Sequence, residues 1–167
     1  MTLTLAPSDV AAPGRVLAPA ALHRWVDAFA VRTTLWEHAV AHDTGGRHFA
    51  SLYRDEHIDV WLLYWNLTDD TGWHDHDISS GAVAVTRGVV AEARLRVGAR
   101  PQVRRVPAGR SFAFGPERIH RVSGAVDGSV SIHAYSPPLV RMGQYSMSPS
   151  GILRRVSVGY ESELSPG

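Results

Sequence analysis

The chain has 167 residues, of which 44% are hydrophobic and 20% charged, and its formal net charge at pH 7 is +1. This length and composition predict one water-soluble domain with a substantial core. No apolar run approaches the ~18 residues of a membrane span, and the near-neutral charge gives no indication of binding to nucleic acid or anionic lipid.

The first quarter of the chain is expected to be an irregular arm followed by helix. Residues 1–18 contain Pro7, Pro13 and Gly14 and no apolar periodicity, which predicts a flexible arm before a single domain over 19–167. The arm lacks the basic and apolar regions of a secretory signal, so we expect a cytoplasmic protein. Over residues 20–42, apolar residues recur at three- and four-residue steps, which predicts one or two amphipathic helices ending near 43–46.

After residue 46 the pattern changes to short β-rich runs that are separated by turn residues. The predicted strands are 58–65, 81–87, 89–96, 102–107, 111–114, 120–123, 129–135 and 153–158. This number and spacing are typical of a jelly-roll. The expected fold class is therefore mainly β: a jelly-roll β-barrel with one or two N-terminal α-helices packed alongside.

Three histidines form the strongest candidate for a metal site. His74 and His76 lie two residues apart in an extended segment, so their side chains project to the same face. His120 follows a turn and begins another predicted strand, which a barrel can return to the same point. The chain has no cysteine, so any metal must be held by nitrogen or oxygen ligands. The intervening Asp75 should point to the other face and stabilise the loop.

The segment from about residue 53 to residue 145 resembles the cysteine dioxygenase family of thiol dioxygenases, within the cupin superfamily, and most closely its bacterial branch. The resemblance rests on His-Asp-His at 74–76, Ile-His-Arg-Val at 119–122 and Ser-Ile-His-Ala-Tyr-Ser-Pro-Pro at 131–138. Many metal-binding cupins add a glutamate ligand four or five residues after the first pair. This chain has Ser80 and Gly81 there, and the cysteine dioxygenase family likewise uses three histidines without an acid.

The resemblance implies that His74, His76 and His120 hold Fe(II), and that cysteine or a related small thiol is oxidised by O2 to its sulfinic acid. Three neutral imidazoles leave the charge of the ion uncompensated, which suits a thiolate. The residues alone leave alternatives open, because imidazole also suits Zn, Cu and Ni. A non-redox cupin that holds Zn, Mn or Ni is one alternative, and a structural or regulatory β-domain with incidental histidines is another.

Ser131, His133 and Tyr135 alternate along one predicted strand, so their side chains share a face and can form a hydrogen-bonded relay. The family resemblance implies that this relay places the Tyr135 hydroxyl beside the iron, where it orients oxygen or substrate. Animal members of the family carry a crosslink between this tyrosine and a cysteine. The matching position here is Gly81, so the crosslink cannot form.

The substrate pocket is less determined by the sequence. The resemblance suggests Arg54 or Arg47 as the anchor of a substrate carboxylate, with Arg141 as an alternative, and Leu63 and Trp65 as pocket walls. A dense aromatic set can also hold a bulkier or cationic thiol, such as a betaine thione. This set consists of Trp61, Tyr64, Trp65 and Trp73. The sequence therefore does not decide between cysteine and other substrates, among them 3-mercaptopropionate, cysteamine and ergothioneine.

The expected partners are a small thiol and O2, without nucleic acid or membrane. The sequence does not determine the oligomeric state and is compatible with a monomer. It also does not distinguish the metal without the family resemblance, because the ligand atoms are imidazole nitrogens.

Overall fold

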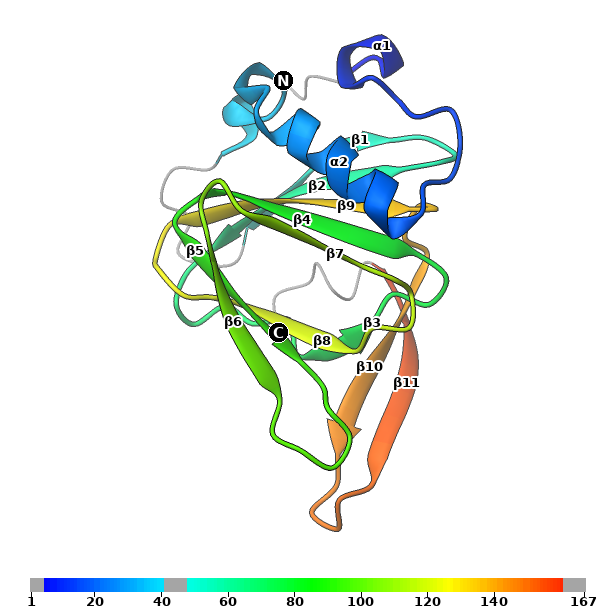
Figure 1. The fold of residues 1–167 in the computed structure, drawn as a ribbon, viewed down its shortest axis with the longest axis vertical. Helices are drawn as coiled ribbons and strands as arrows, with labels where there is room; N and C mark the ends of the chain where they lie inside the picture. Colours follow the sequence, from blue (N-terminus) through cyan, green and yellow to red (C-terminus); the bar gives the residue numbers. More distant parts are fainter. Residues whose placement is uncertain (1–4, 41–47, 161–167) are drawn as a thin grey trace.

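The computed structural model describes residues 5–40 and 48–160 as two antiparallel β-sheets with helices against one of them (Figure 1). The first sheet has the order β1 (His48–Arg54), β2 (Asp59–Trp65), β9 (Ser129–Ser136), β4 (Ser80–Arg87) and β7 (Ser111–Phe114). The second has the order β11 (Leu153–Gly159), β10 (Arg141–Met147), β3 (Trp73–Asp75), β8 (His120–Gly124), β5 (Val89–Arg94) and β6 (Gln102–Pro107). The expected mainly β class is confirmed.

The helical part is short and lies before the first strand. It consists of α1 (Pro7–Val10), α2 (Pro19–Ala30) and two 3-10 turns, η1 (Thr33–Leu35) and η2 (Glu37–Ala39). None of the helices in the described part of the chain is long and apolar enough to cross a membrane. The expected helix end near residues 43–46 lies outside the described residues.

The five-stranded sheet is buried on both faces at its centre. On one face, apolar residues such as Leu62 of β2 and Ile132 of β9 pack in a cluster with α2, which crosses this sheet (Figure 1). On the other face, Leu63 and Val83 belong to a second cluster that includes residues of the six-stranded sheet. Because side chains alternate along a strand, this sheet separates a helix-facing layer from the interior of the barrel.

The N-terminal segment differs from the flexible arm predicted over 1–18. Within its described part, Val10 and Leu17 are only 2% and 7% exposed and belong to the helix-facing cluster. The backbone N–H of Leu17 also donates to Oγ of Ser136 at 2.8 Å. Scattered apolar residues can therefore anchor a segment without the periodicity of a regular element.

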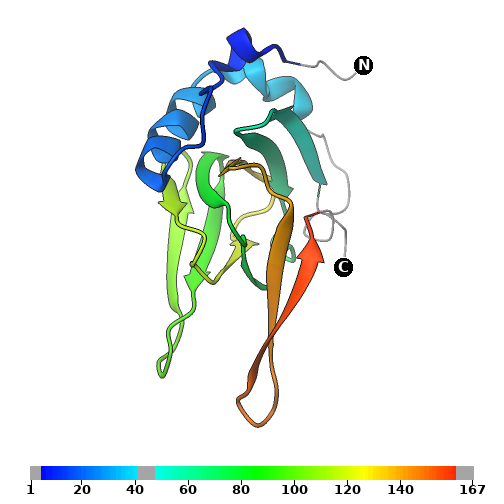
Figure 2. The same ribbon diagram turned by 90° about the vertical axis from the view of Figure 1, so that its right-hand side faces the viewer.

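All eight predicted strands are present, and three further strands were not in the predicted set. β1 pairs with β2, and β10 pairs with both β11 and the short β3. Figure 2 shows that the β10–β11 hairpin projects well beyond the barrel. At the barrel end of the hairpin, β10 pairs with β3, and β3 pairs in turn with β8. These pairings connect the hairpin to the rest of the six-stranded sheet.

The packing of α2 on the sheet gives a test of this architecture. Leu22 of α2 is fully buried against the sheet, so Leu22→Ala should lower the free energy of unfolding by about 2–5 kcal/mol through lost burial and a residual cavity. Val31 at the end of the same helix is 78% exposed, and Val31→Ala should change it by less than about 0.5 kcal/mol. Urea denaturation measures both, and equal effects would contradict this packing.

Candidate metal centre

The three predicted histidines converge inside the barrel. β3 carries His74, His76 follows directly after β3, and His120 begins β8. The pairing of β3 with β8 places His74 directly opposite His120. One ring nitrogen from each histidine lies within 4.8 Å of the others, and all three side chains are buried. This group can hold one metal ion.

Two of these imidazoles are oriented by hydrogen bonds on the side away from the cluster. Nδ1 of His74 lies 3.0 Å from the carbonyl oxygen of Gly72, and Nδ1 of His120 lies 2.9 Å from Oε1 of Glu92. A carbonyl and an ionised carboxylate only accept, so Nδ1 carries the proton in each ring. Nε2 of both rings is then a lone-pair donor available to a metal.

His76 is the third donor, and its environment fits a bound cation. It is 1% exposed, and neither of its ring nitrogens has a hydrogen-bond partner among the described residues. Its ring packs between Tyr135 and Phe114, at centroid distances of 5.2 and 4.7 Å. Burial, followed by the neighbouring histidines, lowers the pKa of His76 well below its usual value. A neutral imidazole without a partner is suited to a metal ligand, because a buried unpaired polar group is otherwise costly.

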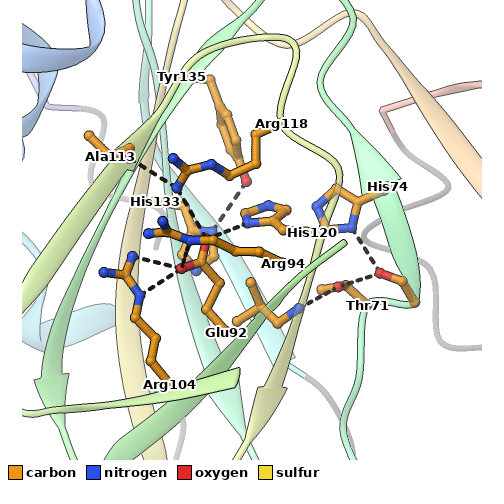
Figure 3. Close-up of polar contacts among 12 residues, drawn as sticks. Thr71, His74, Glu92, Arg94, Arg104, Ala113, Arg118, His120, His133 and Tyr135 are labelled. Carbon is orange, nitrogen blue, oxygen red and sulfur yellow. Dashed lines mark hydrogen bonds and ion pairs between the residues drawn. The ribbon is translucent and has the colours of Figure 1, made fainter. Parts of the chain in front are cut away.

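Behind His120 lies a charged cluster that the motif analysis did not include. Glu92 of β5 is fully buried, and it pairs with the guanidinium groups of Arg94, Arg104 and Arg118 (Figure 3). Burial alone would raise the pKa of Glu92, but the hydrogen bond from His120 and the arginine charges lower it to about 2. The sequence did contain a signal: Glu92 shares a strand face with the apolar Val90, and a carboxylate there requires buried partners.

The predicted relay is present along β9. Oγ of Ser131 lies 2.9 Å from Nε2 of His133, and Nδ1 of His133 lies 3.2 Å from the hydroxyl of Tyr135. Trp65 extends this chain, because its indole N–H donates to Oγ of Ser131 at 2.8 Å. Trp65 is therefore a buried member of the relay as well as part of the interior wall, and Leu63 packs in the same interior cluster.

The expected aromatic wall is divided between faces of β2. Trp61 and Trp65 share the interior face, whereas the intervening Tyr64 lies in the helix-facing cluster. Trp73 lies in β3 and lines a groove on the outside of the six-stranded sheet. The four residues thus do not form a single surface.

The predicted carboxylate anchors occupy different places. Arg54 ends β1 and forms an ion pair with the buried Asp59. Arg141 is exposed, while the next residue, Met142, is 1% exposed and packs in the interior cluster. Neighbours on a strand point to opposite faces, so Arg141 faces away from the histidines, and its predicted substrate role gains no support. Arg47 lies outside the described residues.

Gly81 lies next to Tyr135 on the neighbouring strand β4. A side chain at this position would collide with the ring of Phe114, which fills the space above the glycine. The same ring packs on His120 at a centroid distance of 4.4 Å. Gly81 is therefore required for the close approach of Phe114 to the histidine cluster, and Tyr135 is held by hydrogen bonding and packing.

Asp75 lies between two of the histidines but is directed elsewhere. Its carboxylate accepts from the Arg155 side chain at 2.7 and 2.9 Å and from the hydroxyl of Tyr145 at 2.5 Å. These partners belong to β10 and β11. Asp75 thus ties β3 to the neighbouring hairpin, as expected for a carboxylate that stabilises the local fold.

Comparison with known protein families gives a match that covers this site. The family profile described as cysteine dioxygenase type I matches residues 20–148, which include all three histidines and the relay. The chain belongs to the cysteine dioxygenase type I family. No curated protein sequence matches it significantly.

Solved structures show the fold class of this family member. KdgF from Halomonas sp. has a TM-score of 0.50 at 16% identity, covering 58% of this chain and 84% of its own. A double-stranded β-helix protein from Klebsiella pneumoniae has a TM-score of 0.51 at 12% identity, covering 72% and 92%. An RmlC-like cupin from Desulfovibrio desulfuricans has a TM-score of 0.50 at 17% identity, covering 59% and 90%. These likenesses confirm the cupin barrel and carry no information about activity.

The Glu92–His120 contact gives a test of the metal centre. Glu92→Gln keeps the shape of the side chain but removes the charge that orients the imidazole, so metal affinity should fall about 10- to 100-fold. Competition with a chromogenic chelator for Co(II) measures the affinity. The exposed Glu117 supplies the matched control, because Glu117→Gln should bind Co(II) like the parent protein. Unchanged affinity in Glu92→Gln would mean that packing alone orients His120.

Proposed function

We propose that this protein is an Fe(II)-dependent thiol dioxygenase that converts cysteine or a related small thiol to its sulfinic acid. The observation that carries the proposal is the position of the relay beside the three histidines: the ring of Tyr135 stacks on His76 at a centroid distance of 5.2 Å. Membership of the cysteine dioxygenase type I family supports the reaction class.

The overall reaction combines one thiol with one O2. Two sulfur–oxygen bonds form, the O–O bond breaks, and sulfur gives four electrons to O2, while the thiol proton leaves with the sulfinic acid or to solvent. Fe(II), held by His74, His76 and His120, would supply adjacent positions where thiolate and O2 meet. Neutral imidazole ligands leave the cation charge available to attract a thiolate.

The protein itself contributes orientation and a dry environment. His133 and Ser131 fix the direction of the Tyr135 hydroxyl, which can then donate a hydrogen bond to an oxygen atom of the substrate. Apolar side chains such as Leu63 and Met142 line the same interior and exclude water from it. Polar interactions in such an environment are stronger than in water.

A second candidate is a non-redox cupin that holds Zn, Mn or Ni, as an isomerase or a binding module. The donor set favours it as well, since imidazole nitrogens bind several divalent metals. The relay that ends at Tyr135 supports the dioxygenase instead, because a binding module has no need of an oriented hydroxyl beside its metal.

Ligand substitutions test the iron site. His74→Ala and His120→Ala should each lose most of the iron after anaerobic loading with Fe(II), because each removes one of three donors. His38→Ala, at an exposed position before the barrel, should retain it. Metal analysis of the desalted proteins decides the assignment, and full iron content in both ligand variants would reject it.

Tyr135→Phe tests the relay separately from metal binding. This variant should keep its iron but form sulfinate on the order of 100-fold more slowly, because it lacks the oriented hydroxyl donor. O2 uptake and product mass on a panel of thiols give the measurement, with a gain of two oxygen atoms as the expected product. Undiminished turnover would remove Tyr135 from the mechanism, and tightly held non-iron metal without O2 uptake by the parent protein would favour the non-redox cupin.

A further inference from the structure

The segment that carries the first two histidines is attached to different strands on its two sides. Up to His74 the chain is hydrogen-bonded to β8, whereas beyond it β10 is the partner. His76 lies just past the end of β3, and the next residue, Asp77, has left-handed backbone with a φ of 56°. Such backbone is uncommon outside glycine and persists where surrounding contacts hold it. The placement of His76 therefore depends on contacts made by its neighbours.

Asp75 makes these contacts on the side of the sheet opposite to the histidines. Side chains alternate along β3, so Asp75 points to the same side as the residue opposite it on β10, Gly143. Its Oδ1 accepts from the backbone N–H groups of Asp77 and Gly143, each at 3.0 Å, and its Oδ2 accepts from the hydroxyl of Tyr145 at 2.5 Å. One carboxylate thus links the residues on both sides of His76 to β10.

Arg155 of β11 fixes the direction of this carboxylate. Its Nε and Nη2 donate to Oδ2 and Oδ1 of Asp75, at 2.7 and 2.9 Å, in a bidentate pair. The pair lies against the backbone of β10, because a Cβ at Gly143 would collide with both the guanidinium and the carboxylate. Nη2 also lies 3.6 Å from Oδ1 of Asp77. Bidentate pairing adds geometric specificity to the attraction of the charges.

His76 depends on this arrangement more than the other two histidines do. His74 and His120 are oriented by hydrogen bonds at Nδ1, whereas neither ring nitrogen of His76 has a partner among the described residues. The direction of its ring is therefore determined by its backbone and by ring packing. The residues before and after it, Asp75 and Asp77, both lie within ion-pair distance of Arg155.

We propose that Arg155 is a positioning residue of the metal centre: through Asp75, it holds the histidine segment in place and thereby increases the affinity for the metal. This inference rests on the proposed metal-dependent function. Arg155 comes from the edge strand of the six-stranded sheet and reaches across β10 to β3 (Figure 1). Ligands that are already in place lose less conformational freedom when the metal binds.

Co(II) binding tests this role without turnover. Arg155→Gln removes the bidentate pair and should lower the affinity for Co(II) about tenfold, within the range for residues that orient metal ligands. The sign is diagnostic, because the loss of a positive charge near a cation would by itself raise the affinity. Arg154→Gln removes the same charge from an exposed position on β11 and should not lower it. Competition with a chromogenic chelator gives both affinities.

Three further measurements separate positioning from general destabilisation. The visible bands of bound Co(II), which report its coordination, should shift in Arg155→Gln and stay in place in Arg154→Gln. Arg155→Lys keeps the charge without the planar bidentate fork, so it should show a smaller loss of affinity. In an Asp75→Asn background, Arg155→Gln should cause little further loss, because the two residues act as one unit.

The outcomes separate this inference from the proposed activity. Parent-like Co(II) affinity in Arg155→Gln would overturn the inference and leave the metal centre in place. A full further loss in the Asp75→Asn background would also overturn it, because Arg155 would then act by another route. The expected losses, without sulfinate formation by the Fe(II)-loaded parent protein, would support positioning and reject the dioxygenase. A parent protein that does not bind Co(II) would count against both.

Discussion

The interior of the barrel must satisfy its own polar groups, because β2 and β9 are buried on both faces. Trp65, Ser131, His133 and Tyr135 meet this constraint by bonding one another in a chain. Among the described residues, buried side-chain atoms without a hydrogen bond belong to His76, to Asp59 and to one ion-paired arginine nitrogen. Buried polar atoms in folded proteins nearly always have a hydrogen-bond partner, so the few that lack one mark positions where a bound ligand can supply it.

Charge in this protein is arranged in two layers around the histidines. Burial lowers the pKa of His120 to about 4, and burial with the neighbouring histidines lowers the pKa of His76 well below its usual value, so both imidazoles are neutral near pH 7. Behind them, Glu92 accepts a hydrogen bond from Nδ1–H of His120, and this bond together with the charges of Arg104 and Arg94 keeps Glu92 ionised. The cation charge of a bound metal would thus meet no carboxylate ligand, and the negative charge that orients one ligand is balanced on its far side. This arrangement favours an anionic ligand such as a thiolate at the metal.

The sequence predicted the parts of this site that depend on local pattern. Alternation placed Ser131, His133 and Tyr135 on one face, and the spacing of His74 and His76 indicated a shared face as well. The strands β1 and β10 were not predicted, because they are partly exposed and lack clean alternation. Partners such as Glu92 for a histidine ligand depend on contacts across strands, which a single sequence does not specify.

The position of Arg54 shows why the pocket was harder to predict than the metal centre. Ser51 pairs with Trp61, but a bulge shifts the register, so that Arg54 pairs with Asp59. Without this extra residue, Arg54 would lie opposite Ile58, and its side chain would point to the helix-facing layer. The bulge therefore places the guanidinium of Arg54 on the inner face, next to the buried carboxylate of Asp59 on the neighbouring strand. The side chain of Arg54 thereby forms an ion pair with Asp59 across the two strands, a contact that depends on the bulge and therefore could not be predicted from the sequence.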